Sequence, residues 1–294
     1  MDFTVIIPTY RREEDLNNCL ASVLRQTLLP SAVLVIDDDA LPEDYVAAWR
    51  DKFAARDATF THYRKDHVVE RRGLSESKNR ALTLVTTPVF FVFDDDVVLE
   101  AEFCERVMAV WEERGEDAEL IGVGGVISNH RPRTRREKLF HRFFGLGSAE
   151  AWDVNPVGFQ VWDDDLQGRS VGHYAHGGAC SYDLAKARIL KFTVFSGGRT
   201  ALEDVDFCAR AKQRGWHFVI EPAARLAHYP TVVSREGDYV SGQKESANRR
   251  EIFRTLNPRP TLTRRLWFAW ASTGWVLRQL LAGHWQKSRG LLRG

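Results

Sequence analysis

Three adjacent aspartates, Asp94, Asp95 and Asp96, directly follow five apolar residues, 89–93. An unbroken apolar run of this length is typical of a strand that is buried on both faces of a parallel sheet. Neighbouring carboxylates repel one another and are costly to desolvate, and a bound cation would relieve that cost. Because side chains alternate along a strand, Asp94 and Asp96 are expected to point the same way and to offer oxygen ligands to Mg²⁺ or Mn²⁺. A solvated acidic turn after a core strand is the alternative that these residues leave open.

Two more apolar runs end in polar residues. Residues 3–9 stop at Pro8 and are followed by Tyr10 to Arg12, and residues 32–36 end in Asp37-Asp38-Asp39. Strand and helix patterns alternate through about the first 110 residues, which predicts a doubly wound parallel sheet with right-handed crossovers. Ligands of such sheets bind beyond the carboxyl ends of the strands. We therefore expect these strand ends and the one before Asp94 to line one crevice.

Apolar periodicity predicts the remaining elements. Strands are expected at 3–9, 32–36, 59–63, 89–93, 120–127 and 216–220. Helices are expected at 13–26, 45–55, 74–84, 102–114, 183–190, 203–214 and 242–256. Residues 143–175 read as a long irregular loop that contains a solvated acidic run, Asp163-Asp164-Asp165.

Composition limits the classes of protein that this chain can be. A chain of 294 residues is near the upper size for one hydrophobic core, so one domain with a C-terminal extension or two tightly joined domains fit. The net charge of +1 gives no general attraction for nucleic acid, which is not expected as a partner. The four cysteines lack metal-ligand spacing and indicate a reducing, cytoplasmic compartment. The chain enters a strand at once, so no signal peptide is expected, and no apolar run is long enough to span a bilayer.

Six segments resemble, in order, the motifs of the family 2 glycosyltransferases. They are Ile6–Arg12, Leu16–Gln26, Val35–Asp38, Gly73–Leu82, Asp94–Asp96 and Leu202–Asp206. The resemblance runs from Phe3 to about His228. Two positions depart from the family pattern: Asp39-Ala40 stands where Gly-Ser is usual, and Lys78 stands where arginine is commoner and would offer a bidentate fork.

The resemblance implies a GT-A fold, a Rossmann-like, mostly parallel sheet with flanking helices, and a C-terminal helical extension. It implies a glycosyltransferase domain over 1–230, with a nucleotide-binding half at 1–110 and an acceptor half at 111–230, and a lid and helical tail over 231–294. The implied activity is inverting, metal-dependent transfer of a sugar from a UDP- or dTDP-sugar to a hydroxyl acceptor, in glycan, polysaccharide or glycolipid biosynthesis. A sugar nucleotidyltransferase and an inactive glycan-binding relative are the alternatives. The first would carry a glycine-rich basic loop after strand one, and intact Asp96 and Asp204 argue against the second.

The resemblance also assigns the metal and the base. Asp96 would bind Mn²⁺ or Mg²⁺ directly, Asp94 would bind it directly, through water, or hold the ribose, and His228 would complete the shell or be a surface histidine. Asp204, at the start of an expected helix, is the candidate general base, since a carboxylate can take the proton of an acceptor hydroxyl. The helix dipole favours its charged form there, and capping of the helix is the alternative role.

The donor is expected to contact many of the residues beyond the strand ends. Asp37 or Asp38 would accept the imide N–H of uracil or thymine, and Lys78 would balance the pyrophosphate. The Gly177-Gly178 pair would let backbone approach the donor sugar. The residues expected to contact the donor are Pro8, Thr9, Tyr10, Arg12, Asp37, Asp38, Gly73, Lys78, Asn79, Asp94, Asp95, Gly178 and Glu203.

The C-terminal tail differs in kind from the rest. Residues 266–277 carry no charge, arginines flank them, and four of the nine tryptophans lie in the tail. This composition suits the boundary of a membrane, so we expect peripheral membrane contact through 262–285 on the cytoplasmic side, aided by the basic residues 131–142. The alternative is a helix packed on the catalytic domain or on another subunit of a homo-oligomer. Residues 231–242 are expected to form a mobile lid in which Arg235 reaches the diphosphate.

Overall fold

The structure is a computed structural model, and it describes every residue except 164, 196–201 and 231–236. The strands are β1 (Phe3–Thr9), β2 (Ala32–Asp37), β3 (Thr59–Arg64), β4 (Val89–Phe93), β5 (Val97–Leu99), β6 (Leu120–Ile127), β7 (Asp153–Val154), β8 (Gln160–Val161), β9 (Ser170–Gly172), β10 (Ala179–Asp183) and β11 (His217–His228). The helices are α1 (Glu13–Leu24), α2 (Glu43–Ala54), α3 (Leu74–Leu84), α4 (Phe103–Glu113), α5 (Arg135–Phe143), α6 (Leu184–Leu190), α7 (Glu203–Gln213), α8 (Asp238–Leu256), α9 (Leu262–Leu281) and α10 (Trp285–Arg293).

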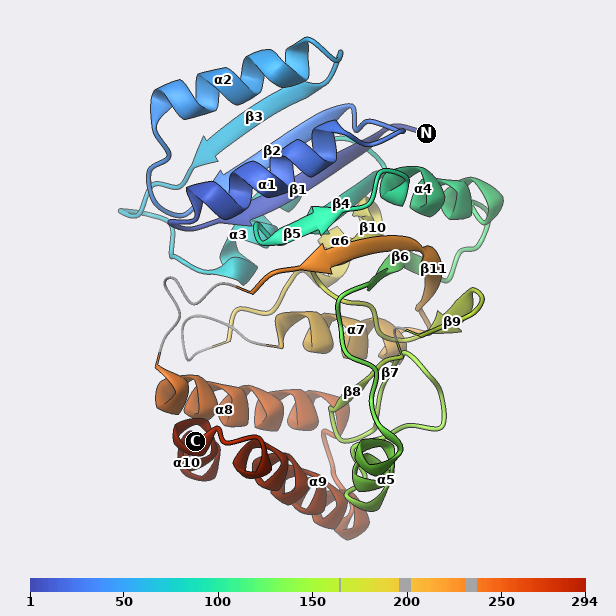
Figure 1. Cartoon of the computed structure of the whole chain (residues 1–294). Helices are drawn as coiled ribbons and strands as arrows, with labels where there is room; N and C mark the ends of the chain where they lie inside the picture. Colours follow the sequence, from blue (N-terminus) through green and yellow to red (C-terminus); the bar gives the residue numbers. More distant parts are fainter. Residues whose placement is uncertain (164, 196–201, 231–236) are drawn as a thin grey trace.

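One central sheet organises the part of the chain that the structure describes. Its strand order is β3-β2-β1-β4-β10-β6-β11-β5, with β9 paired to β11 (Figure 1). The first four strands pair in parallel, as the alternating pattern of the sequence predicts. Strand β10 is antiparallel to both of its neighbours, while β6 and β11 are parallel. The sequence analysis missed β10, and it also missed β5, β9 and the small β7–β8 hairpin, because strands of two or three residues are too short to show a period.

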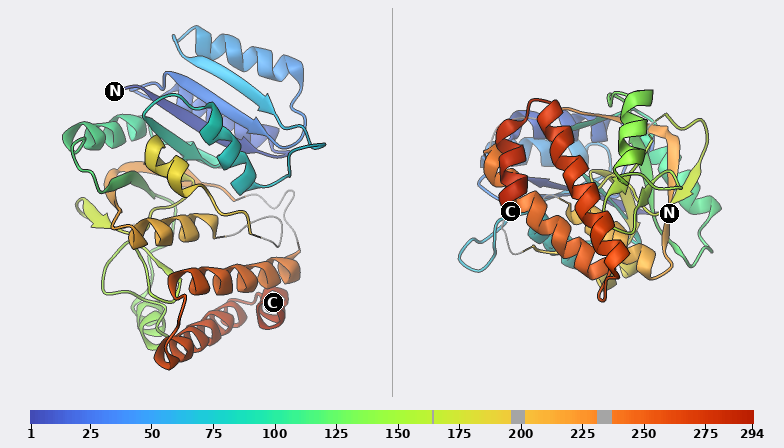
Figure 2. Two further views of the ribbon diagram at one scale, coloured as in Figure 1. Left: turned by 180° about the vertical axis from the view of Figure 1, so that it is seen from behind. Right: turned by 90° about the horizontal axis from the view of Figure 1, so that it is seen from below.

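Helices cover both faces of this sheet. Helices α1, α2 and α4 lie on one face, and α3, α6 and α7 on the other (Figures 1 and 2). Strand β4 is buried along its whole length, and its side chains alternate between the two cores. Phe91 and Phe93 belong to the first core, while Phe90 and Val92 belong to the second. The strand that precedes the three aspartates is therefore central, as predicted.

Helices α8, α9 and α10 form a separate layer at the end of the molecule opposite β3 (Figures 1 and 2). A third apolar cluster joins α9 and α8 to the end of α5 and to the segment between α5 and β8, through side chains such as Phe144, Val157, Phe159 and Phe253. One side of α9 is thus packed on the rest of the protein, which fits the alternative weighed for the tail. No helix within the described residues is long and apolar enough to cross a bilayer.

Two expectations about irregular segments need correction. Residues 143–175 contain the β7–β8 hairpin and buried residues such as Trp152, so they form a packed structure and not a simple loop. Helix α8 begins at Asp238, so the last part of the expected lid is helical. Residues 231–236, including Arg235, lie outside the described residues.

Candidate active site

Polar side chains from the ends of β1 and β4 meet directly. Thr9 Oγ1 donates to Asp95 Oδ2 at 2.8 Å. Arg12 donates to Asp95 Oδ1 at 2.9 Å and to Asp96 Oδ2 at 3.0 Å. Burial raises the pKa of Asp95 to about 6, although Arg12 and the Thr9 hydroxyl act in the opposite direction. Asp95 therefore joins the two strand ends, and Asp96 shares the Arg12 guanidinium with it.

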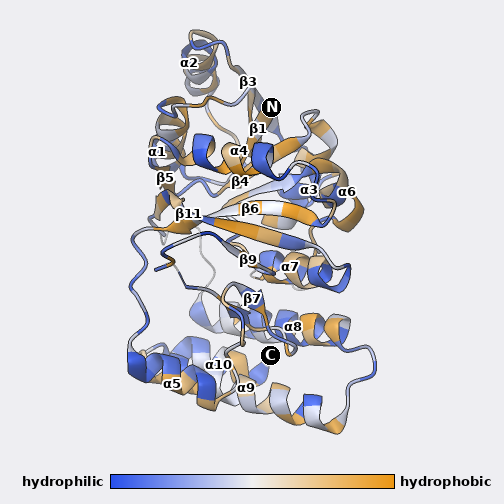
Figure 3. Ribbon diagram, turned by 90° about the vertical axis from the view of Figure 1, so that its right-hand side faces the viewer, coloured by the Kyte–Doolittle hydropathy of each residue, from blue (hydrophilic) through white to orange (hydrophobic). Residues whose placement is uncertain are grey.

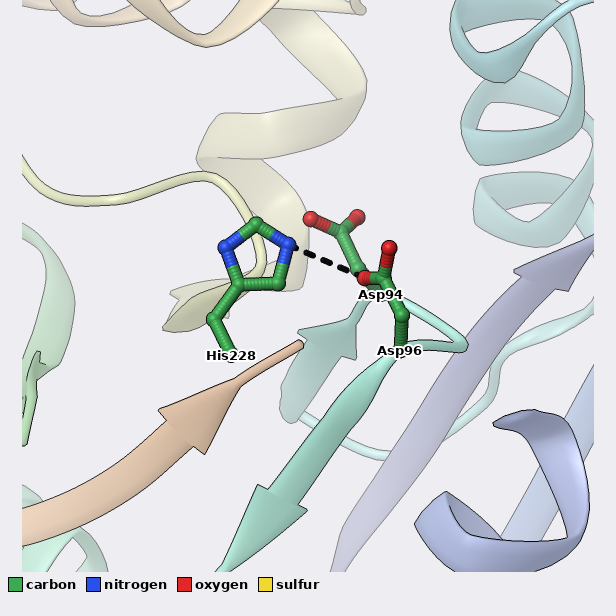
Figure 4. A group of neighbouring side chains, drawn as sticks. All are labelled: Asp94, Asp96 and His228. Atoms are coloured by element: carbon green, nitrogen blue, oxygen red, sulfur yellow. Dashed lines mark ion pairs between the residues drawn. The ribbon is translucent and has the colours of Figure 1, made fainter. Parts of the chain in front are cut away.

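Asp94, Asp96 and His228 converge on one point (Figure 4). One possible ligand atom from each lies within 4.8 Å of the others, and His228 Nε2 lies 3.0 Å from Asp96 Oδ1. Backbone pairing of β11 with β5 and the hydrogen bond from the Tyr229 N–H to the Asp96 carbonyl oxygen (2.8 Å) bring His228 to the aspartates. Burial raises the pKa of Asp94, and the nearby Asp96 adds to this, because two buried anions disfavour each other. Two oxygens and one imidazole nitrogen fit a hard divalent cation such as Mn²⁺ or Mg²⁺.

Lys78 supplies a buried positive charge beneath this cluster. Its Nζ donates to Glu203 Oε1 at 2.9 Å, and so ties α3 to the start of α7. Burial alone would lower the pKa of Lys78, but Glu203 and Asp94 outweigh it and the pKa is raised. Lys78 stays charged at neutral pH.

Asp204 lies beside Lys78 at the start of α7. It accepts hydrogen bonds from the Tyr174 hydroxyl (3.2 Å, Oδ2) and from the Val205 N–H (2.8 Å, Oδ1). The sequence analysis expected the helix dipole to favour its charged form. Burial and the neighbouring Glu203 are stronger, and they raise the pKa of Asp204 against the opposing effect of Lys78. A raised pKa makes this carboxylate a better proton acceptor than an exposed aspartate.

The turn formed by Gly177 and Gly178 separates the two acidic groups. A Cβ atom on Gly177 would lie 2.7 Å from the Cβ of Asp204, and one on Gly178 would lie 2.3 Å from Asp94 Oδ2. Neither position has room for a side chain. The backbone of this turn therefore contacts the candidate metal ligand on one side and the candidate base on the other.

These groups share one pocket of about 280 Å³. Its lining includes six residues that the sequence analysis assigned to the site: Lys78, Asp94, Gly178, Glu203, Asp204 and His228. It also includes His130, Trp162 and His176, to which the sequence analysis gave no role. The structure thus places the candidate base in the same cavity as two of the three candidate metal ligands, Asp94 and His228.

The carboxylates after β2 are already engaged by the protein. Asp37 accepts the N–H groups of Asp39 and Leu41, each at 2.8 Å, and contacts His62 Nε2 at 3.0 Å. Burial would raise the pKa of Asp37, but His62 and these N–H groups outweigh it and the pKa is lowered.

Asp38 has a different set of partners. Its Oδ2 accepts the Gly73 N–H at 2.8 Å, and its Oδ1 lies 2.5 Å from Nζ of the buried Lys65. Any nucleobase that binds here shares these carboxylates with protein donors. The sequence analysis missed Lys65, because a single lysine in a polar segment carries no pattern.

Several other predicted contact residues lie away from the pocket lining. Asn79 exchanges two hydrogen bonds of 2.8 Å with the backbone of Phe192, so its side chain shapes that loop. The Tyr10 ring lies 5.1 Å from the Arg11 guanidinium and 5.5 Å from that of Arg72. Pro8 pairs with Ile36 inside the sheet.

Gly73 immediately precedes α3 and has a positive φ of 145°, and a Cβ there would overlap the Glu76 carboxylate. Its N–H faces Asp38, so it belongs to the group of residues around the end of β2.

An aromatic group surrounds His176, the residue before the glycine turn. Its ring lies 5.1 Å from that of Trp152, 5.5 Å from Trp162 and 5.6 Å from Tyr174. The position of His176 beside Gly177 was the signal in the sequence that could have identified it. The aromatic partners come from the segment expected to be an irregular loop.

Comparisons with known proteins agree with this geometry. The sequence model of the family described as Glycosyl transferase family 2 matches residues 4–163, more than half of the chain. The glucosyl-dolichyl phosphate glucuronosyltransferase of Haloferax volcanii is 29% identical over 130 residues, which cover 43% of this chain and 38% of that protein. This chain therefore matches well under half of that relative's length.

Solved structures share the fold at low sequence identity. A mannosyltransferase, PcManGT from Pyrobaculum calidifontis in complex with GDP-Man and Mn²⁺, has a TM-score of 0.57 at 16% identity, over 95% of this chain and 75% of that one. GalNAc-T7 with UDP, GalNAc and Mn²⁺ has a TM-score of 0.60 at 12% identity, over 88% of this chain and 56% of that one.

Proposed function

Because the chain belongs to glycosyl transferase family 2 and has the GT-A fold, we propose that it transfers a sugar from a UDP- or dTDP-sugar to an acceptor hydroxyl, with inversion at the anomeric carbon. The observation that carries the proposal is the pocket that Asp204 shares with Asp94 and His228. A glycosyl transfer needs a group that holds the leaving diphosphate and another that takes a proton from the acceptor. This pocket contains residues suited to both tasks.

The donor side of the pocket would hold the diphosphate. Asp94, Asp96 and His228 would bind Mn²⁺ or Mg²⁺, and such an ion, when bound, stabilises the negative charge that develops on the leaving group. Lys78, which also lines the pocket, adds a buried positive charge. The two structural neighbours described above were solved with Mn²⁺, which supports a divalent ion.

The acceptor side would be organised by Asp204. Its raised pKa suits removal of the hydroxyl proton as the new bond forms, and the Tyr174 hydroxyl holds one of its oxygens in place. A single base that acts from the face opposite the leaving group gives inversion. We assign the nucleotide-binding half to residues 1–110, the acceptor half to 111–230, and the lid and tail to 231–294.

The test is donor hydrolysis and transfer with a panel of UDP-, dTDP- and GDP-sugars, each with Mn²⁺, with Mg²⁺ and with EDTA. We expect metal-dependent release of UDP or dTDP from one of these donors, and NMR of the product should show the opposite anomeric configuration. A sugar nucleotidyltransferase would instead release pyrophosphate from a nucleoside triphosphate and a sugar 1-phosphate. An inactive glycan-binding relative would turn over none of them.

We also propose that the enzyme contacts an anionic membrane surface from the cytoplasmic side. Helix α9 carries exposed Leu262, Leu266, Trp270, Leu277 and Leu281 at spacings of four or seven residues, which places them along one side of the helix. The exposed Phe143 of α5 continues this stripe, since its ring lies 5.4 Å from that of Trp270. Figure 3 shows α5 and α9 together at one end of the molecule, with apolar and hydrophilic residues interspersed.

The charge of the tail supports an anionic lipid as the partner. Residues 252–294 contain seven arginines, one lysine and no acidic residue, in a chain whose net charge is only +1. An exposed apolar stripe flanked by arginines suits the headgroup region of an anionic bilayer.

The check is cosedimentation with anionic and with neutral liposomes. We expect the Leu266→Ser/Leu277→Ser variant to lose binding to anionic vesicles, while Val68→Ser, which changes a 91% exposed valine on a distant loop, binds normally. If the parent stays in the supernatant with both kinds of vesicle, the membrane proposal is wrong.

A further inference from the structure

A second and larger cavity, of about 1190 Å³, adjoins the catalytic pocket. Residues of α5, of α9 and of the segment from Gly145 to Asp165 line it. His130 and Trp162 line both cavities, so the two meet at these side chains. An acceptor whose hydroxyl lies at Asp204 can extend past Trp162 into this space.

Most acidic groups of this cavity already have basic partners. Glu137 pairs with Arg131 at 2.6 Å, Asp163 pairs with Lys138 at 3.7 Å, and Asp153 pairs with Lys212 at 2.6 Å. Glu150 faces His173 at 3.3 Å. Asp165 is the remaining acid, and it is exposed.

Besides Arg131, which pairs with Glu137, three arginines lie among the lining residues. The Arg133 guanidinium stacks over the Trp162 ring at 4.4 Å, at the junction with the catalytic pocket. Arg142 and Arg278 form no ion pair with any described carboxylate, so their charges are available to a ligand.

The surroundings of His141 also show that this part of the cavity is positively charged. It is 8% exposed, and its buried Nε2 has no hydrogen-bond partner among the described residues. Burial, together with the charges of Arg133 and Arg278, lowers its pKa to about 4. The wall of the cavity formed by α5 and α9 is therefore positive and carries an uncharged imidazole at neutral pH.

We propose that this cavity binds a phosphate or diphosphate group of the acceptor, carried on an apolar chain. Arg142 and Arg278 would bind the phosphate, and Arg133 would lie at the junction between this cavity and the catalytic pocket. Trp267, Val161 and Pro156 supply apolar surface in the same cavity, and the exposed stripe of α9 lies beside it. This inference rests on the proposed function and names the chemical class of its acceptor.

Isothermal titration calorimetry of the full chain, with UDP and Mn²⁺ present, tests it. The probes are geranyl phosphate, geraniol and inorganic phosphate. We expect geranyl phosphate to bind at least about tenfold more tightly than the other two, since a charge-assisted hydrogen bond contributes about 1.5–3 kcal/mol. Arg142→Gln and Arg278→Gln should each weaken its binding by about tenfold or more. Arg135→Gln is the matched control, because Arg135 is an exposed arginine of α5 that does not line the cavity.

Affinity for UDP with Mn²⁺ is measured in the same variants and should not change. If the parent does not bind UDP in the presence of Mn²⁺, that result counts against the proposed function and not against the phosphate site. Arg142 is exposed, so its replacement should leave the fold intact even if the Arg278 variant, which loses a stacking contact with Trp275, proves unstable. Unchanged geranyl phosphate affinity in the Arg142 variant would overturn the proposal. Equal affinity for geraniol would do the same, and equal affinity for inorganic phosphate would show a free-anion site instead.

Discussion

Two runs of three aspartates follow strands on either side of β1, and their surroundings differ. In the run after β2, Asp37 accepts hydrogen bonds from two backbone N–H groups and contacts His62. Asp38 forms an ion pair with Lys65, and Asp39 forms one with Arg11. The protein itself balances these charges, and the pKa of Asp37 is lowered.

The run after β4 is not balanced in this way. Burial raises the pKa of Asp94 and brings that of Asp95 to about 6. Arg12 bridges Asp95 and Asp96, which leaves Asp94 and the other oxygen of Asp96 beside His228. The two runs have the same three residues after a strand, so sequence and position do not decide the role of a run. The role depends on how many hydrogen-bond donors the fold supplies to each carboxylate.

The largest expected effect comes from the second run. Replacing both Asp94 and Asp96 by Asn should lower sugar transfer by about ten-thousandfold or more, because a metal site supplies several kcal/mol to the transition state. In EDTA, the melting temperature should stay the same or rise, since two crowded anions are removed. Turnover assays and thermal melting measure the two effects, and Asp51→Asn, a change at an exposed aspartate of α2 that lines neither cavity, is the control. A large fall in melting temperature would show that this run is structural, like the first.

Asp204→Asn addresses a carboxylate that belongs to neither run. It should reduce turnover by about a hundred- to ten-thousandfold while UDP affinity with Mn²⁺ stays normal. Stopped assays of transfer and calorimetry with UDP separate the two quantities. Near-normal turnover would remove Asp204 from the mechanism.

Asp37→Asn should act on stability more than on chemistry. The amide keeps the shape but loses the charge that holds two N–H groups and His62, so we expect a loss of about 2 kcal/mol in the free energy of unfolding. Urea unfolding of this variant beside Asp96→Asn gives the comparison directly. If both variants lose the same stability, the contrast between the two runs does not hold.

The smallest effect is a dependence on pH. The pKa of Asp37 in the folded protein lies below its ordinary value of 3.8, so its contribution to stability is complete above that value and is lost as the pH falls through the folded pKa. The gap in unfolding free energy between the parent and Asp37→Asn should therefore be largest above about pH 5 and shrink toward about pH 2. A gap that stays constant over this range would mean that the Asp37 carboxylate does not titrate as described.

The sequence predicted much of this arrangement. The apolar run before Asp94 gave a central strand, and the alternation of patterns gave the parallel half of the sheet and the meeting of its strand ends. The resemblance to family 2 glycosyltransferases predicted the fold. It also predicted that Asp204 and His228 lie near Asp94, although the three residues are far apart in the chain.

Other features had no local signal. The pairing of Lys65 with Asp38, and of Tyr174 with Asp204, depends on which loops meet after the chain has folded. The antiparallel direction of β10 follows from a crossover that no residue pattern encodes. The larger cavity is lined by α5 and α9, which lie more than a hundred residues apart in the chain, and it arises only when these helices pack together.

The glycine turn at Gly177 and Gly178 has a consequence for how such an enzyme can diversify. Any side chain at either position would displace Asp94 or Asp204, so we expect neither glycine to tolerate substitution. The walls of the larger cavity formed by α5 and α9 contact neither glycine. If the larger cavity binds the acceptor as we propose, substitutions in those two helices can exchange one acceptor for another over evolutionary time without moving Asp94 or Asp204.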